Sequence, residues 1–378
     1  MKRYEKNEEY DLWLACLGGE SSVKTVQIAK EAGGSEALFS LPRDGLLKLK
    51  GVGERSADYI IEGRKSWDAE KKRAELAQKG IRFIPWYDRD YPKRLLQTEG
   101  YPFALFVKGE LPPEERSSVA IIGARECSEY GREAASFFAK ALASADVSVI
   151  SGMAIGIDGI SQMEALRAGG RSFGVLGCGV DVCYPASNRN LYRMLEEHGG
   201  LISEYAPGVS AITWHFPARN RIISGLCDLL LVVEAKEQSG TFITVDAALE
   251  QGREICVVPG RIFDPMSAGC NRLWKQGAVP VTDPEELLEL LNNGLFPVLL
   301  SEGTGRDTAK AESELSLESD EKLVYSCLDL YARSAEEIMK DAHLSYPDFL
   351  RILTALECKG YVRRVSPGYY IRVSRSGS

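Results

Sequence analysis

Residues 119–150 read VAIIGARECSEYGREAASFFAKALASADVSVI, and this stretch decides the fold. An apolar, β-branched run at 119–122 is followed by a helical pattern at 130–143 and by a second apolar run at 147–150. Strands without polar alternation are covered on both faces of a sheet. The stretch therefore predicts a strand, a crossover helix and a second, parallel strand.

The same alternation continues along the chain to about residue 291. The further strand-like runs are 173–176, 201–203, 229–233 and 255–258, and the further helical patterns are 159–167, 191–197 and 244–251. Repeated strand and helix units of this kind predict an α/β fold with a doubly wound parallel sheet of the Rossmann type.

Smaller units are expected on both sides of this sheet. Residues 1–68 predict a helical, SAM-like domain, and Leu49 to Ala57 places two glycines just ahead of a helix, as in a helix-hairpin-helix turn. The amides of such a turn can face a phosphate, but many of these small domains only pack against a neighbour. Residues 69–117, with strand candidates at 81–86 and 103–108, are expected to extend the sheet domain, which then covers 69–292.

The C-terminal part predicts a polar linker over 293–320 and a winged helix over 321–375. Three helical patterns, at 323–330, 335–339 and 346–358, precede a hairpin around Pro367 and Gly368. The segment after Glu357 has no acidic side chain, which suits a nucleic-acid surface or a protein-docking face. Its basic residues are Lys359, Arg363, Arg364, Arg372 and Arg375.

Composition limits the classes of function. The 378 residues carry a net charge of −8, so binding to a polyanion has to use a local basic patch. The first ten residues lack a signal-peptide pattern and no run of about 18 apolar residues follows, which predicts a cytoplasmic protein. The nine cysteines form no Cys-x-x-Cys pair, so we expect reduced thiols.

Glycine-bearing turns follow three of the predicted strands: Gly123-Ala124-Arg125, the run from Ser151 through Gly152, Ala154 and Gly156 to Asp158, and Gly177-Cys178-Gly179 with Tyr184-Pro185 and Asn188. Free amides at such turns can bind anions, whereas glycines can also serve only tight packing. No turn has the Gly-x-Gly-x-x-Gly or the Walker pattern, so a dinucleotide or ATP is not expected.

A fourth segment, Trp214 to Gly225, combines two arginines with aromatic rings. Arginine offers a planar fork to phosphate oxygens, and aromatic rings offer a surface to an unstacked base. Arg219 and Arg221 do not share a helix face, so one can bind a ligand while the other braces the sheet. Two further turns, at Glu234 to Thr241 and at Pro259 to Arg261, are expected at the same carboxyl edge.

Catalytic patterns are weak. His198, His215 and His343 lie in different elements without metal-site spacing, and no Gly-x-Ser-x-Gly elbow is present. We therefore expect a binding protein without catalytic residues, metal or cofactor.

The ordered motifs resemble the DNA-processing protein A (DprA/Smf) family. They are Ser151 to Asp158, Gly177 through Tyr184-Pro185 and Asn188, Ser203-Glu204 with Pro207-Gly208, Phe216 to Leu226, Glu234 with Ser239 to Thr244, Pro259-Gly260, and Gly269 to Asn271 with Gly277-Ala278. The resemblance covers nearly the full length. It implies a homodimeric protein that binds single-stranded DNA without sequence preference, protects incoming strands and loads the RecA recombinase during natural transformation, without membrane insertion.

Taken together, the loops after the predicted strands and the resemblance predict these DNA-binding residues: Gly123, Ala124, Arg125, Gly152, Ala154, Gly156, Thr213, Phe216, Arg219, Asn220, Arg221, Lys236, Ser239 and Gly240. Two of these positions depart from the family pattern. Ala124 replaces a hydroxyl residue, and Thr213 stands where several relatives have a lysine. We therefore expect a lower affinity for DNA than is usual in the family.

Two other functions remain open from the sequence. A similar sheet occurs in phosphoribohydrolases, but their Pro-Gly-Gly-x-Gly-Thr loop is broken here, because Arg261 follows Pro259-Gly260. The second alternative is an adaptor whose end domains recruit partners.

Overall fold

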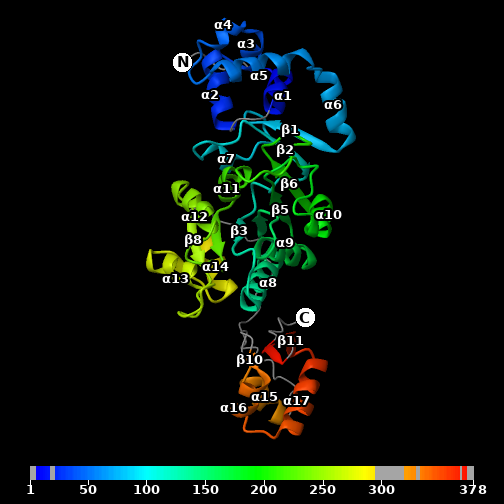
Figure 1. The fold of residues 1–378 in the computed structure, drawn as a ribbon, viewed down its shortest axis with the longest axis vertical. Helices are drawn as coiled ribbons and strands as arrows, with labels where there is room; N and C mark the ends of the chain where they lie inside the picture. The colour runs from blue at the N-terminus through cyan, green and yellow to red at the C-terminus, as the bar shows by residue number, and fades with distance from the viewer. Residues whose placement is uncertain (1–5, 18–21, 294–318, 329–332, 367, 373–378) are drawn as a thin grey trace.

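The computed structural model describes residues 6–17, 22–293, 319–328, 333–366 and 368–372 (Figure 1). A nine-stranded sheet forms its centre, with the strand order β1-β2-β6-β5-β4-β3-β7-β8-β9. The strands are β1 (Ile81–Pro85), β2 (Ala104–Gly109), β3 (Ser118–Ile122), β4 (Ser148–Ser151), β5 (Ser172–Val175), β6 (Gly199–Ser203), β7 (Leu229–Val232), β8 (Glu254–Val257) and β9 (Val279–Pro280).

The seven strands from β6 to β9 in this order are parallel, and only β1 and β2 are antiparallel. The predicted α/β fold with a Rossmann-type parallel sheet is thereby confirmed. The two antiparallel strands extend the sheet beyond β6, so the candidate strands at 81–86 and 103–108 are confirmed as sheet members. All five residues of β3 are buried, as expected for a strand covered on both faces.

Helices cover both faces of the sheet. Val119 and Ile121 pack on the face of α8, whereas Ala120 and Ile122 pack on the face of α11. The first face carries α8 (Glu129–Ser144), α9 (Ile157–Arg167), α10 (Arg189–His198), which follows the 3₁₀ turn η1 (Ala186–Asn188), and α14 (Pro284–Asn293). The second carries α7 (Lys93–Leu96), α11 (His215–Leu226), α12 (Thr241–Glu250) and α13 (Ala268–Lys275).

Helix α11 makes the long connection of the sheet. It leads from β6 to β7, and these two strands are separated in the sheet by β5, β4 and β3. Strand β7 pairs with β3. The helix begins at the carboxyl edge, beside Gly177 after β5, where the Nδ1 of His215 lies 3.1 Å from the carbonyl oxygen of Gly177. It ends at the amino edge, where the hydroxyl of Ser118 donates to the carbonyl of Leu226 at 2.8 Å.

In the described part of the chain before β1 there are six helices, and they lie next to β1 and β2 in Figure 1. Their core includes Phe103 and Ala104 from the start of β2. Gly51 has a φ of +86° and Gly53 is the N-cap of α5, so this turn has the glycine geometry expected ahead of a helix. The helices are α1 (Glu8–Leu17), α2 (Ser22–Ala32), α3 (Ser35–Ser40), α4 (Arg43–Leu46), α5 (Glu54–Lys65) and α6 (Ala69–Gln78).

The C-terminal residues form three helices and a small sheet of order β10-β12-β11, which confirms the predicted winged helix. The elements are α15 (Ser319–Ser326), β10 (Arg333–Ser334), α16 (Ala335–Asp341), α17 (Tyr346–Cys358), β11 (Val362–Ser366) and β12 (Tyr369–Arg372). Arg363 of β11 lies 2.6 Å from the carboxylates of both Glu129 and Glu133, so the wing contacts the first turns of α8 (Figure 1).

Among the residues with described positions, no helix combines the length and the apolar character needed to cross a bilayer.

Candidate nucleic-acid interface

The turns after β3, β4 and β7 meet at the carboxyl edge of the sheet, which we call the rim. The amide of Ala124 donates to the carbonyl of Glu234 at 2.8 Å, and the amide of Ile157 donates to the carbonyl of Ala124 at 3.1 Å. Gly156 has a φ of +78°, and an added Cβ there would lie 2.3 Å from the oxygen of Ala124. A glycine is therefore required for this close approach of two turns.

The first turn of α11 joins the rim through its side chains. The ring of Phe216 lies 5.4 Å from that of Tyr184 and covers Gly177, where an added Cβ would be 2.9 Å from the Phe216 ring. The ring of His215 stacks on Tyr205 at 3.8 Å, and burial lowers its pKa. Phe216 is half-buried, so the residue keeps some exposed surface beside these contacts.

Arg219 is held inside the rim. Its side chain is 5% exposed and donates to the carbonyl of Gly152 at 2.9 Å and to the carbonyl of Val175. Burial lowers the pKa of Arg219 to about 10, an effect opposed by the nearby Asp158. Burial also raises the pKa of Asp158, and Arg219 opposes that shift. Arg219 therefore braces β4 and β5 from α11.

Arg221 is also used within the protein, because its guanidinium lies 2.6 Å from the carboxylate of Glu204. The sequence suggested that one arginine of this pair binds a ligand while the other braces the sheet. The geometry places Arg219 in the bracing position and gives Arg221 an acidic partner. Contact of either arginine with DNA stays a prediction.

Arg125 and Lys236 are the exposed cations among the predicted site residues. Arg125 follows β3 and Lys236 follows β7, and these strands are neighbours in the sheet. Burial is the main cause of the lowered pKa of Arg219, and the charge of Arg125 lowers it further. Arg125 thus lies close enough to Arg219 for the two charges to interact.

Three backbone amides at the first two turns are bonded within the protein. The amide of Ala124 donates to Glu234, the amide of Gly152 donates to Asp158 at 3.2 Å, and that of Met153 donates to Gln162 at 3.0 Å. An added Cβ at Gly152 would lie 2.7 Å from both Arg219 and Asp158. These three amides and Gly152 therefore serve internal bonding and close packing.

Glu234 occupies the start of α8. Its carboxylate accepts from the amide of Ser128 at 2.9 Å and from its hydroxyl at 2.5 Å. Burial raises the pKa of Glu234, and the bonds from Ser128 oppose the shift. An added Cβ at Gly131 would lie 2.3 Å from this carboxylate. The carboxylate of Glu234 therefore takes the place of an anion at this helix start.

The remaining predicted residues lie around the same edge. Thr213 and Gly240 are exposed, and Ala154 and Ser239 are half-buried. The side-chain oxygen of Asn220 accepts from Arg219 at 3.3 Å, so Asn220 is tied to the brace.

Tyr184 and Asn188 enter the sequence prediction only as part of a turn, yet both shape the rim. Tyr184 is 48% exposed and its ring lies beside Phe216. The side-chain amide of Asn188 donates to the carbonyls of Met153 and Ala154, each at 3.0 Å. The Tyr-Pro turn was the available signal, but it did not show which ring would face Tyr184.

The basic residues of the winged helix mostly have partners in the protein. Lys359 lies 2.7 Å from Glu321, Arg363 binds the two glutamates of α8, and the guanidinium of Arg372 lies 5.2 Å from the ring centre of Tyr325. Arg375 lies outside the described residues. This pairing of Arg363 favours the docking interpretation over a free nucleic-acid surface.

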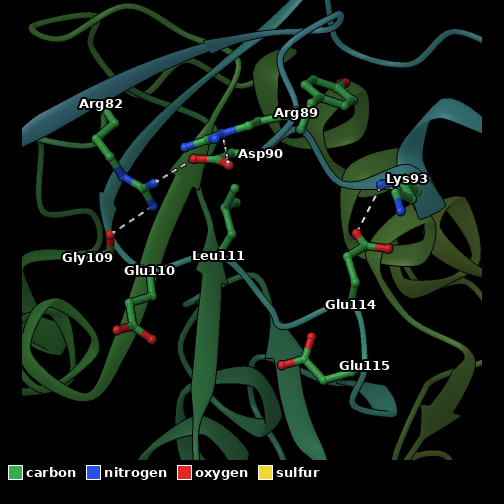
Figure 2. Close-up of a pocket in the computed structure, with 10 residues that line it drawn as sticks. Arg82, Arg89, Asp90, Lys93, Gly109, Glu110, Leu111, Glu114 and Glu115 are labelled. Carbon is green, nitrogen blue, oxygen red and sulfur yellow. Dashed lines mark hydrogen bonds and ion pairs between the residues drawn. The ribbon is translucent and has the colours of Figure 1, made fainter.

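A separate hollow of about 560 Å³ lies at the opposite edge of the sheet (Figure 2). Gly109 lines it and pairs with Gly200 at the start of β6, so the hollow belongs to the amino edge. Its charges are mixed, since Arg82 faces Asp90 at 3.8 Å and the amide of Lys93 donates to Glu114 at 2.9 Å. It offers an anion no concentrated positive field.

Within the described ranges, no three His, Cys, Asp or Glu side chains gather in a way that could hold a metal ion.

Comparison with known proteins gives the family. Residues 82–292 match the family model described as DNA recombination-mediator protein A, and residues 308–368 match the model described as DprA winged helix domain. The chain is 37% identical over 308 residues to "Protein Smf" of Escherichia coli K12, and the match covers 80% of each chain. The chain belongs to the DNA recombination-mediator protein A (DprA/Smf) family.

Further DprA proteins support this membership. The DNA processing protein DprA of Streptococcus pneumoniae R6 is 40% identical over 201 residues, which are 53% of this chain and 71% of that protein. The X-ray structure of DprA from Streptococcus pneumoniae aligns with a TM-score of 0.64 at 32% identity, covering 75% of this chain and 98% of that one. A structure of Helicobacter pylori DprA, described as showing a unique single-stranded DNA binding mode, aligns with a TM-score of 0.50 at 25% identity, covering 56% and 95%.

Proposed function

We propose that the rim binds single-stranded DNA without sequence preference. The observation that carries this proposal is that Phe216, on α11, lies at the same edge of the sheet as the exposed Arg125. Helix α11 is held there because Arg219 donates to backbone carbonyls at the ends of β4 and β5. Membership of the DprA family supports it, as does the Helicobacter pylori relative that is described as binding single-stranded DNA.

The chemistry of the rim fits an unpaired strand. The accessible part of the Phe216 ring, beside Tyr184, offers a face on which a base can stack. Arg125 offers a fork of donors to a phosphate, which positions the strand without reading its sequence. Because every base has a π-face, this arrangement tolerates any sequence.

We further propose that the protein acts by binding rather than by turnover, forms homodimers and loads the RecA recombinase on incoming strands during natural transformation. Family membership is the support for the recombinase and for the dimer. Sedimentation of the purified protein at micromolar concentration is expected to show a dimer, and a monomer would contradict that part of the proposal.

Replacing Arg125 with alanine is expected to weaken binding to oligothymidylate and to flatten its salt dependence. Removing one cation that neutralises a phosphate of a single strand reduces the slope of log K against log salt by about 0.7. The measurement is a titration of a labelled oligothymidylate at several salt concentrations. Arg125 is exposed, so the fold should not change.

The matched control is Arg171→Ala, because Arg171 at the amino edge is 42% exposed and pairs with Glu110 at 3.2 Å. It should leave both affinity and slope as in the wild type. An unchanged slope in Arg125→Ala would remove Arg125 from the site. Equal affinity of the wild type for single-stranded and duplex DNA would instead favour the adaptor function.

A further inference from the structure

Two aromatic side chains that are not among the predicted DNA-binding residues are presented to solvent by turns at the rim. Phe263 is 92% exposed and Trp214 is 72% exposed. Large aromatic side chains at such exposure keep much apolar surface in water, and covering that surface with a partner is favourable.

The turn that carries Phe263 is firmly built. The amide of Asp264 donates to the carbonyl of Arg261 at 3.1 Å, which closes a turn with Ile262 and Phe263 at its tip. The base of the loop is held where the hydroxyl of Tyr130 donates to Pro259 at 2.7 Å and the side-chain amide of Asn271 donates to Gly260 at 3.1 Å. Phe263 is therefore held outward by a bonded loop.

Trp214 is equally well placed. It is the N-cap residue of α11, directly before His215, whose ring is stacked on Tyr205 and lies within hydrogen-bond distance of the Gly177 carbonyl. Its backbone is fixed by the same turn that presents Phe216, while most of its indole faces solvent.

The sheet order places these rings at two ends of one line. Trp214 lies beyond the end of β5, Phe263 follows β8, and the order between them is β5-β4-β3-β7-β8. Four strand spacings of about 4.8 Å give about 19 Å along the rim. This span corresponds to at most about six nucleotides, given the 3.4 Å rise of a stacked strand.

Exposed cations lie between the two rings, but acids accompany them. Arg125 is followed by the exposed Glu126, and Lys236 is followed by the exposed Glu237. These acids reduce the net positive charge of the rim, although the guanidinium of Arg125 remains exposed for a phosphate contact. Stacking then has to supply a larger share of the binding free energy than in a strongly basic groove.

We propose that single-stranded DNA lies along the rim from Trp214 to Phe263, and that these two rings stack bases at its ends while Phe216 stacks a base near the Trp214 end. The occupant is a nucleobase rather than a protein or a lipid, because the rings are separated by cations along one edge and are continuous with the proposed DNA site. The inference rests on the proposed function.

The test uses the full chain and oligothymidylates from about three to about twelve nucleotides. The wild-type affinity should rise with length up to about six nucleotides. Trp214→Ala and Phe263→Ala should each lower the affinity for the longer oligonucleotides by about 5- to 100-fold and leave that for the shortest ones nearly unchanged. Phe216→Ala should lower the affinity at every length.

Two kinds of substitution, those that keep an aromatic ring and those that remove it, distinguish base stacking from general apolar contact. Phe263→Trp and Trp214→Phe should retain most of the affinity, whereas Phe263→Leu should behave as Phe263→Ala. Binding should quench tryptophan emission in the wild type, and much of this quenching should disappear in Trp214→Phe. Phe137→Ala, which changes a 38% exposed ring on α8 away from the rim, is the matched control and should bind as the wild type.

The outcomes distinguish this inference from the function on which it rests. If the wild type does not bind oligothymidylate, the proposed function itself fails. If the wild type binds and Phe216→Ala weakens it, but either Trp214→Ala or Phe263→Ala matches the wild type at every length, the extended path is wrong. A change of sedimentation in Phe263→Ala with unchanged DNA affinity would likewise overturn it, since the ring would then serve a protein contact.

Discussion

Replacing Phe216 with alanine is expected to lower the affinity for single-stranded DNA by about 5- to 150-fold, because the stacking of one base contributes about 1–3 kcal/mol. The ring combines two properties that the effect requires. It is fixed against Gly177 and Tyr184, and part of it remains accessible at the rim. Fluorescence anisotropy of a labelled oligothymidylate measures the change.

Because Phe216 is half-buried, loss of packing has to be separated from loss of stacking. Phe216→Leu keeps much of the apolar volume against Gly177 but removes the aromatic face. It should keep the thermal midpoint of the wild type and still lose most of the affinity. Wild-type affinity in Phe216→Leu would show that the ring only fills space, and Phe216 would no longer count as a base-stacking residue.

Replacing Arg219 with methionine is expected to reduce the free energy of unfolding by about 3–5 kcal/mol, the usual cost of leaving a buried charge without its partner. The carbonyls of Gly152 and Val175 would lose their donor, and the carboxylate of Asp158 would lose the charge that opposes its desolvation. Urea denaturation followed by circular dichroism gives the value.

The pH dependence of this destabilisation identifies its cause. Burial raises the pKa of Asp158, and removing Arg219 would raise it further. An acid whose pKa is raised by folding destabilises the folded state when it is ionised in the unfolded chain, and does not do so when both states are protonated. The destabilisation in Arg219→Met should therefore be largest near neutral pH and shrink as the pH falls.

The double variant Arg219→Met with Asp158→Asn provides the matched control. It removes the buried negative charge but keeps an oxygen that can accept from the amide of Gly152. It should recover part of the stability near neutral pH and show a weaker pH dependence. A destabilisation in Arg219→Met that is independent of pH and not relieved by Asp158→Asn would assign the effect to packing alone.

The positions of the parallel strands could be predicted from the sequence, because strands buried on both faces carry continuous apolar runs. The run at 119–122 corresponds to β3, and the helical pattern at 346–358 coincides with α17. The antiparallel pairing of β2 with β6 could not be predicted, because partner choice depends on contacts between residues about 100 positions apart.

The meeting of the turns at one edge of the sheet could be predicted, but their inner bonding could not. The aromatic and basic run around Phe216 marked the carboxyl edge, since residue types there differ from those of a core helix. Burial of Arg219 and occupation of the start of α8 by Glu234 depend on segments that meet only in the folded chain. A sequence shows that an arginine or an amide is present, but it does not show which internal acceptor satisfies it.

Helix α11 spans the sheet from the edge that carries Phe216 to the edge where Leu226 receives the hydroxyl of Ser118. Near its end, Gly225 allows Leu95 of α7 to approach so closely that an added Cβ would lie 2.6 Å away. The aromatic and basic segment from Trp214 to Gly225 therefore depends on the surrounding sheet for its orientation. Transplanted into another scaffold without the strands that it crosses, it would keep its residues and lose the orientation that makes them useful.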